Sequence, residues 1–246
     1  MNFNNRIQDC DRLKAELDKL RPLKKEELAQ LRSFFRVGQT YSSNALEGNT
    51  LTEIETKVVI EDGLTVSGKP LREIYEATGN AKAFDYVIDI SKNDLFDEDD
   101  ILELHRIFYQ QIDANEAGSY RKIKVFISGT DLKLPEPSKV PELMSSFVAE
   151  LRIKKEELHP IELAAWIHNE LVTIHPFVDG NGRTARLLMN LALIQAGYTI
   201  TIIPPIYRVQ YLELTRKGND GIHKPFTDFL SCMLYESQKD LLRLLK

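Results

Sequence analysis

Residues 175–186 read His175-Pro176-Phe177-Val178-Asp179-Gly180-Asn181-Gly182-Arg183-Thr184-Ala185-Arg186, and this stretch decides which fold and site we expect. Gly180 and Gly182 let the backbone adopt conformations that larger residues avoid, so consecutive N–H groups can converge on an anion. Apolar residues at helical spacing follow from Arg183 onward, and the N-terminus of a helix attracts negative charge. The stretch therefore predicts an anion-binding loop at the start of a helix.

The charged residues of the loop indicate that the anion is a phosphate. Arg183 and Arg186 lie three residues apart on the first helical turn, where they can contact different phosphates. Asp179 offers an oxygen ligand for a Mg²⁺ ion that bridges nucleotide phosphates, although such a carboxylate can also cap the next helix. The glycines are not followed by the Gly-Lys-Ser/Thr of a Walker P-loop, and the partner motifs of a protein kinase are missing.

His175 is the candidate general base. It follows a predicted helix and precedes Pro176, which restricts its backbone. An imidazole titrates near neutral pH and could take the proton from an attacking hydroxyl, but a single histidine can equally be structural. The other histidines have no comparable neighbours and are expected to be structural or surface residues: His105, His159, His168 and His223.

The flanking sequence predicts an all-α fold. Apolar residues recur at helical spacing over residues 160–174 and again from Arg183 to Gly197, so the loop joins two buried helices. Further helices are expected over 13–20, 28–35, 52–63, 70–88 and 97–108, and from Pro225 to the end of the chain. The acidic run at 97–100 suits the positive end of a helix dipole better than a metal site.

One region breaks the helical pattern. Residues 122–127 and 132–134 alternate polar and apolar side chains, and residues 128–131 supply a turn between them. This pattern predicts a small β-hairpin. Because a lone hairpin is marginally stable in water, it is expected to lie against the helices as a flap.

Composition limits the classes of function. The chain has 246 residues, 43% hydrophobic and 28% charged, as in a globular protein, and its net charge of −5 argues against a general nucleic-acid binder. Cys10 and Cys232 are far apart, so a disulfide framework is not expected. Residues 1–20 lack the apolar centre of a signal peptide, and the apolar stretch 187–196 is too short to span a bilayer. We therefore expect a cytoplasmic protein without nucleic-acid or membrane partners.

The loop resembles the signature of the Fic (Fic/DOC) family, HPF-x-[D/E]-GNGR-x-x-R, at every fixed position. The likeness extends over roughly residues 40–235 and includes Leu-Glu-Gly-Asn-Thr-Leu-Thr at 46–52, Gly-Lys-Pro-Leu at 68–71 and Gly-Ser-Tyr-Arg at 118–121. Members of this family are helical, and they typically transfer AMP from ATP to a hydroxyl group of a target protein, releasing pyrophosphate.

The resemblance implies a role for each residue of the loop. His175 would deprotonate a Ser, Thr or Tyr of the target, Asp179 would help to hold Mg²⁺, and Phe177 would anchor the loop in the core. The hairpin would receive an extended segment of the target by β-augmentation. The ATP phosphates would be bound by the remaining loop residues, with the last of them on the γ-phosphate: Gly180, Asn181, Gly182, Arg183 and Arg186.

A second motif, Ser43-Asn44-Ala45-Leu46-Glu47-Gly48, fits the inhibitory pattern [S/T]-x-x-x-E-[G/N] of similar proteins. Four-residue spacing places Ser43 and Glu47 on one helix face; the alternative is a helix that ends at Gly48 with Glu47 in solvent. In similar proteins this glutamate pairs with the second arginine of the loop, here Arg186, and takes it from the γ-phosphate. Related proteins also use the glutamate to position water for the removal of AMP, so both roles stay open.

The sequence thus predicts an autoinhibited, Mg²⁺-dependent protein adenylyltransferase that uses ATP. A protein that mainly removes AMP, or a nucleotide-sensing interaction module without turnover, are the alternatives. Residues 1–90 are expected to form an N-terminal helical region with the inhibitory helix at about 40–48, and residues 91–246 a Fic core with the flap at about 122–134. Tyr207 and Tyr211 are candidates for the adenosine end of the site. Similar proteins form dimers, so a homodimer is a further expectation.

Overall fold

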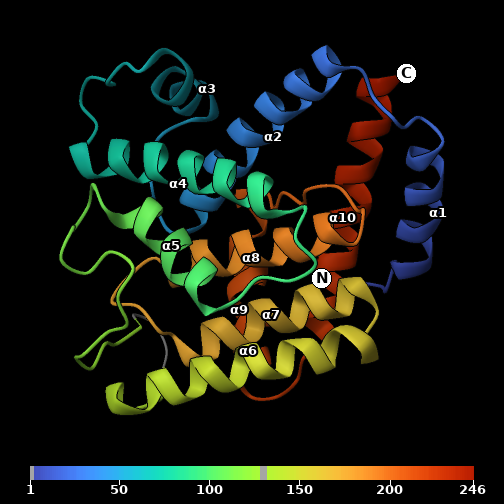
Figure 1. The fold of residues 1–246 in the computed structure, drawn as a ribbon. Helices are drawn as coiled ribbons and strands as arrows, with labels where there is room; N and C mark the ends of the chain where they lie inside the picture. Colours follow the sequence, from blue (N-terminus) through green and yellow to red (C-terminus); the bar gives the residue numbers. More distant parts are fainter. Residues whose placement is uncertain (1–2, 128–131) are drawn as a thin grey trace.

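The structure, a computed structural model, describes residues 3–127 and 132–246 of the chain. Every regular element in these two ranges is a helix, which confirms the predicted all-α fold (Figure 1). The longer helices are α1 (Ile7–Asp18), α2 (Lys25–Leu46), α4 (Leu71–Ile90), α5 (Glu98–Tyr109), α6 (Val140–Glu157), α7 (Pro160–Ile174), α8 (Asn181–Gln195), α9 (Arg208–Asn219) and α10 (Lys224–Leu245). The short elements are α3 (Glu53–Lys57), η1 (Val58–Asp62), η2 (Pro137–Lys139) and η3 (Pro205–Tyr207).

Helices α7 and α8 pack against each other in the centre of the molecule, and the other helices surround them (Figure 1). Most side chains of these two helices are buried, because apolar residues occupy most of their positions. Helix α7 has the predicted bounds. Helix α8 begins at Asn181, slightly earlier than predicted, because Gly180 adopts the left-handed conformation (φ 80°) and the helix can start directly after it.

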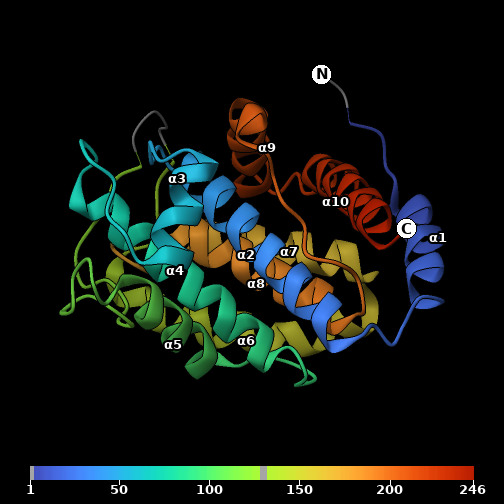
Figure 2. The same ribbon diagram turned by 90° about the horizontal axis from the view of Figure 1, so that it is seen from above.

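Helices α2 and α4 lie side by side, and α2 runs over α8 (Figure 2). Helix α2 ends at Leu46, with Glu47 as its C-cap and Gly48 in a left-handed conformation. The next helix, α3, starts where the sequence predicts a helix, with a capping box between Thr52 and Glu55. This geometry places the end of α2 and the beginning of α4 against the loop between α7 and α8.

The edge of the molecule is formed by α1 and α10, which pack along each other (Figure 1). Asn5 donates a hydrogen bond from Nδ2 to Asp228 Oδ1 (2.9 Å), so the segment before α1 is bound to α10. Cys10 and Cys232 are both free thiols, as predicted. No helix in residues 3–127 and 132–246 combines the length and the apolarity needed to cross a bilayer.

The predicted β-hairpin is not formed where the structure describes it. Residues 122–127 and 132–134 contain no strand, so both predicted strands are wrong there, and the predicted turn at 128–131 lies outside the described residues. The two arms meet at their base through Arg121, which donates from Nη1 to Ile123 O (3.3 Å) and from Nη2 to Pro135 O (2.7 Å). A lone hairpin is marginal, and prolines such as Pro135 cannot donate to a ladder, which accounts for the difference.

Candidate active site

The loop between α7 and α8 is held in shape by its own side chains. Asn181 closes it: Oδ1 accepts from Phe177 N–H and Nδ2 donates to Phe177 O, both at 2.9 Å. Phe177 is fully buried, as predicted for the residue that anchors the loop. The Asn181 side chain is thus engaged within the loop, and only its backbone N–H is left to face an anion.

His105 of α5 packs against the loop. Its ring stacks on Phe177 at 3.7 Å, its Nδ1 accepts from Gly118 N–H (3.0 Å), and its Nε2 lies 3.1 Å from Asp179 O. Burial lowers the pKa of His105 to about 4, so the ring is neutral and Nε2–H donates to Asp179 O. The prediction that His105 is structural is consistent with this position, but its contact with the loop could not be foreseen.

The glycines of the loop lie where larger residues would collide with their neighbours. A Cβ at Gly180 would lie 2.7 Å from the ring of Phe108. A Cβ at Gly182 would overlap Oε1 of Glu47 and would lie 3.1 Å from Nη1 of Arg186. The first N–H groups of a helix have no partner within it, so the start of α8 offers donors to an anion. The carboxylate of Glu47 lies next to Gly182 in the first turn of α8.

Arg186 is buried and is bound on three sides, with 3% of its side chain exposed. It donates from Nε to Ser43 Oγ and from Nη2 to Ser43 O, each at 2.9 Å. It also donates from Nη2 to Glu47 Oε1 (2.7 Å) and from Nη1 to Tyr211 OH (2.8 Å). The structure therefore brings Ser43 and Glu47 to Arg186, the pairing that the inhibitory motif implies.

Glu47 is ionised at neutral pH. Burial by itself raises the pKa of this carboxyl group, but the charges of Arg186 and Arg183 and the hydrogen bond from Arg186 outweigh burial. The pKa consequently lies below 4.5, its ordinary value. A negative charge thus occupies the start of α8, where a phosphate would otherwise be attracted.

His175 lies at the end of α7 in a left-handed conformation (φ 52°), which is uncommon for a residue other than glycine. Its Nδ1 lies 3.3 Å from Val172 O, so Nδ1 carries the proton and Nε2 can accept one. Burial, and after it the nearby charge of Arg121, lowers the pKa of His175 below 6.5. The neutral ring and Glu47 line the same cavity, which has a volume of about 500 Å³. His175 is therefore suited to act as a base.

Arg121 connects the histidine to the flap. This side chain, 2% exposed, donates from Nε to His175 O (2.7 Å), and its backbone N–H donates to Pro176 O (2.9 Å). The same guanidinium binds the carbonyl groups at the base of both flap arms, as described above. One buried cation thus joins the backbone at His175 to the bases of both flap arms.

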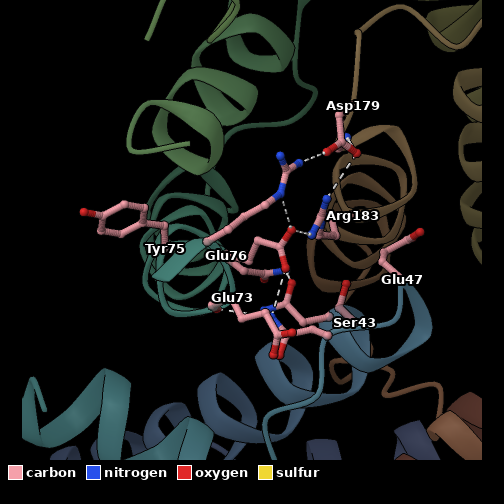
Figure 3. A network of polar contacts seen from close by, with 12 residues as sticks. Ser43, Glu47, Glu73, Tyr75, Glu76, Asp179 and Arg183 are labelled. Carbon is pink, nitrogen blue, oxygen red and sulfur yellow. Dashed lines mark hydrogen bonds and ion pairs between the residues drawn. The ribbon is translucent and has the colours of Figure 1, made fainter. Parts of the chain in front are cut away.

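The remaining charges of the loop are paired with α4. Arg183, 3% exposed, lies with Nη2 3.3 Å from Asp179 Oδ1 and with Nη1 3.2 Å from Glu76 Oε1. Asp179 Oδ2 accepts from Nη2 of Arg72 (2.6 Å). Figure 3 shows Arg183 between Glu76 and Asp179, with dashed lines to both carboxylates. The sequence reasoning missed Arg72 and Glu76; their spacing of four residues indicates an ion pair on one helix face, but not that this face meets the loop.

The two candidate tyrosines lie in different places. Tyr211 lines the cavity, but its hydroxyl group is engaged by Arg186 and by His168 Nε2 (2.8 Å), and its side chain is buried. Tyr207 packs against the rings of Phe3 and Phe229 instead. The structure therefore does not bring Tyr207 to the cavity with the other candidates.

A Mg²⁺ ion would have to be shared with a ligand at this site. Within the described residues there is no group of three or more His, Cys, Asp or Glu side chains that could hold a metal. Magnesium commonly takes only one or two carboxylates and completes its shell with water and substrate phosphates. Asp179 at the mouth of an anion loop fits that arrangement.

The fold places the anion-binding loop at the start of the buried helix α8, beside the neutral ring of His175. The sequence profile of the Fic/DOC family matches residues 95–193. Fic-1 (residues 134–508) from Caenorhabditis elegans superimposes with a TM-score of 0.86 at 30% identity, over 97% of this chain and 70% of that one. A Fic-domain signalling protein from Bacteroides thetaiotaomicron gives 0.87 at 29% identity, over 96% and 97% of the two chains. The chain belongs to the Fic/DOC family, as its loop predicts.

Two curated relatives carry the name protein adenylyltransferase Fic. The one from Nematostella vectensis is 43% identical over 194 residues, which are 78% of this chain and 45% of the relative. The one from Aedes aegypti is 38% identical over 194 residues, 78% of this chain and 38% of the relative. The chain thus spans less than half the length of these relatives.

Proposed function

We propose that this protein is a protein adenylyltransferase, which transfers AMP from ATP to a Ser, Thr or Tyr hydroxyl group of a target protein, and that Glu47 holds it inhibited. The names of the relatives from Nematostella vectensis and Aedes aegypti support the activity. The observation that carries the proposal is the contact between Glu47 and Arg186 (2.7 Å), made above the start of α8 in the cavity that His175 also lines.

In the proposed reaction, the oxygen of the target hydroxyl group attacks the α-phosphorus of ATP, and Nε2 of His175 takes the proton of that hydroxyl group. The bond from the α-phosphorus to the bridging oxygen breaks, and pyrophosphate leaves. The neutral state of His175 is what a base requires, and its position in the cavity would supply the alignment. Arg183 and the N-terminus of α8 would offset the negative charge of the phosphates. Asp179 would hold Mg²⁺, which neutralises and orients the phosphates when bound.

The inhibition follows from charge and space together. A γ-phosphate at Arg186 would meet the carboxylate of Glu47, and the two anions repel each other. Because the carboxylate stands so close to Gly182 that a Cβ there would overlap it, phosphate oxygens cannot take the same place. Glu47 lies in the same chain as the loop, so this inhibition is intramolecular.

The experiment is AMP incorporation from labelled ATP into proteins of a host lysate, with magnesium present. We expect the wild type to label weakly and Glu47→Gly to gain about 10- to 100-fold, the range of a charge-assisted hydrogen bond of about 1.5–3 kcal/mol. Adding His175→Ala to Glu47→Gly should abolish the labelling. If Glu47→Gly binds ATP and gains nothing, the inhibitory role of Glu47 is wrong.

A second candidate function is the removal of AMP from a modified target. Glu47 and His175 line one cavity, so the carboxylate could position a water molecule for attack on the phosphorus. Wild-type protein would then release AMP from a target labelled beforehand by Glu47→Gly, and Glu47→Gly itself would not. Tight ATP binding by Glu47→Gly without any transfer would instead favour a nucleotide-sensing module.

The flap is the proposed docking place of the target. Ile123 and Phe126 on its first arm are 62% and 91% exposed, and such apolar side chains suit contact with an extended segment. The cytoplasmic location, the homodimer and the division of the chain at about residue 90 stay predictions from the sequence.

A further inference from the structure

Helix α4 presents two charged side chains that match two of the charges of the anion-binding loop. Arg72 and Glu76 are four residues apart on α4, and Asp179 and Arg183 are four residues apart across the start of α8. Arg72 Nη2 lies 2.6 Å from Asp179 Oδ2, and Arg72 Nε lies 3.4 Å from Glu76 Oε1. With the contacts of Arg183 to Asp179 and Glu76, the four side chains form a closed ring of alternating charge (Figure 3).

We propose that Arg72 stands in for a divalent cation at Asp179, and that loading of a metal–nucleotide complex requires Arg72 to leave this carboxylate. In the same ring Glu76 is a positioning residue, which keeps Arg183 directed at the loop. The proposal rests on the proposed function, because the cation in question is the one that would accompany ATP.

The two halves of the ring differ in burial, and this difference determines which contact can open. Arg183 is 3% exposed and Glu76 11%, whereas Arg72 is 56% exposed and Asp179 40%. Arg183 also lies over the ring of Phe108 at 4.6 Å. Separating Arg183 from Glu76 would take from this buried guanidinium group the more buried of the two carboxylates in the ring, which is costly. Arg72 can instead turn into solvent, so the contact between Arg72 and Asp179 is the one that can exchange.

The two carboxylate oxygens of Asp179 have different partners. Its Oδ1 accepts from Gly180 N–H (2.6 Å) and from Arg183 Nη2 (3.3 Å), whereas Oδ2 accepts from Arg72. Oδ2 is thus the oxygen that a metal would compete for. A hard cation such as Mg²⁺ prefers carboxylate oxygens, and a guanidinium group on the same oxygen would repel it. With a metal bound at Asp179, the attraction between Arg72 and the carboxylate would be offset by repulsion from the metal, so Arg72 would move away.

The test measures nucleotide binding and not turnover. The parent is Glu47→Gly, the probe is α,β-methylene-ATP, which cannot donate AMP, and its affinity is measured by calorimetry over a series of Mg²⁺ concentrations. We expect Arg72→Gln in this parent to lower the Mg²⁺ concentration needed for half-maximal affinity roughly 2- to 5-fold, as for the loss of a partly exposed ion pair. Arg72→Lys, which keeps the charge, should resemble the parent.

Matched conditions separate this effect from a general change in charge. Arg243→Gln removes an exposed arginine paired with Asp240 on α10, and its Mg²⁺ dependence should equal that of the parent. In EDTA, Arg72→Gln should bind the probe no better than the parent, because it has lost a positive charge.

The outcomes distinguish the two proposals. If the parent binds the probe in a Mg²⁺-dependent manner and Arg72→Gln has the same or a greater Mg²⁺ requirement, the stand-in role of Arg72 is overturned and the proposed function is not. If the parent binds the probe without any Mg²⁺ dependence, the role of a metal at Asp179 is overturned as well. If the parent binds no probe at any Mg²⁺ concentration, the proposed function itself falls, and this inference with it.

Discussion

Two helices bring charged side chains to the anion loop, and they bring opposite charges. The end of α2 places a carboxylate, Glu47, on Arg186, the residue that we propose to bind a phosphate. The beginning of α4 places a guanidinium group, Arg72, on Asp179, the residue that we propose to bind a metal. Each charge of the loop is therefore paired, within the same chain, with a group of the same sign as the ligand expected there.

The two pairs differ in how firmly they are built. Arg186 is 3% exposed and also donates to Ser43 and Tyr211, so its pair with Glu47, which is 35% exposed, is anchored in a buried network. The pair between Arg72 and Asp179 is half-exposed and has a single short hydrogen bond on the α4 side. Buried charged hydrogen bonds are worth more than exposed ones, so α2 should dominate the inhibition and α4 should tune it.

The largest effect expected from a change of charge alone comes from neutralising the carboxylate of Glu47 without removing its bulk. Glu47→Gln keeps the shape of the side chain but loses the charge that opposes a γ-phosphate. Labelled-ATP incorporation should rise above that of the wild type, roughly tenfold for a loss of about 1.4 kcal/mol, yet stay below that of Glu47→Gly. Glu103→Gln, an exposed acid paired with Arg106 on α5, serves as the control and should leave incorporation unchanged.

Either extreme would revise this account of the inhibition. An inactive Glu47→Gln would mean that the space above Gly182 matters and the charge does not. Activity equal to that of Glu47→Gly would mean that charge alone blocks the nucleotide.

The sequence predicted the contact made by α2 because both of its halves belong to short, specific motifs. Glu47 lies at a fixed distance from Ser43, and Arg186 ends the loop motif, so the pairing could be inferred without a structure. The bounds of α7 followed equally well from apolar periodicity.

The contact made by α4 could not be predicted in the same way. Arg72 and Glu76 look like an ordinary ion pair on an exposed helix face, and nothing local shows that the face meets a loop more than a hundred residues later. Arg121 was passed over for the same reason, since its partners are backbone carbonyl groups that carry no sequence signal. The prediction of strands in the flap was wrong because alternation of polar and apolar residues alone does not supply the neighbouring strands that stabilise a strand.

A second prediction concerns stability and contrasts the two halves of the ring. Glu76→Gln removes the charge opposite the buried Arg183, and we expect a loss of about 1–3 kcal/mol in the free energy of unfolding. Arg72→Gln disrupts only the exposed half, and the expected loss is about 0–1 kcal/mol. Urea denaturation of both variants and the wild type measures the difference. Equal losses would show that the ring is not divided into a fixed and an exchangeable half.

The smallest expected effect is a shift in the pKa of His175, and it tests whether the two helices act on the base to the same extent. Burial and the charge of Arg121 lower this pKa below 6.5, while the nearby charges of Glu47 and Asp179 raise it. Glu47→Gln should therefore lower the pKa of His175 further, whereas Arg121→Gln should raise it. Arg121, Glu47 and Asp179 are the charges that act most strongly on this ring, so Arg72→Gln should shift the pKa of His175 less than Glu47→Gln does.

An NMR titration of the His175 ring measures these shifts directly. The lowered pKa of His175 in the folded protein also determines how its titration changes the free energy of unfolding with pH. The folded-state pKa lies below the unfolded value, so the unfolded chain binds more protons between the two values. The titration of His175 therefore leaves the free energy of unfolding unchanged above pH 6.5. It lowers that free energy as the pH drops from 6.5 toward the folded-state pKa. If Arg72→Gln moved the titration as far as Glu47→Gln does, the fields of α2 and α4 would reach the base equally, and the division of labour between the two helices would not hold.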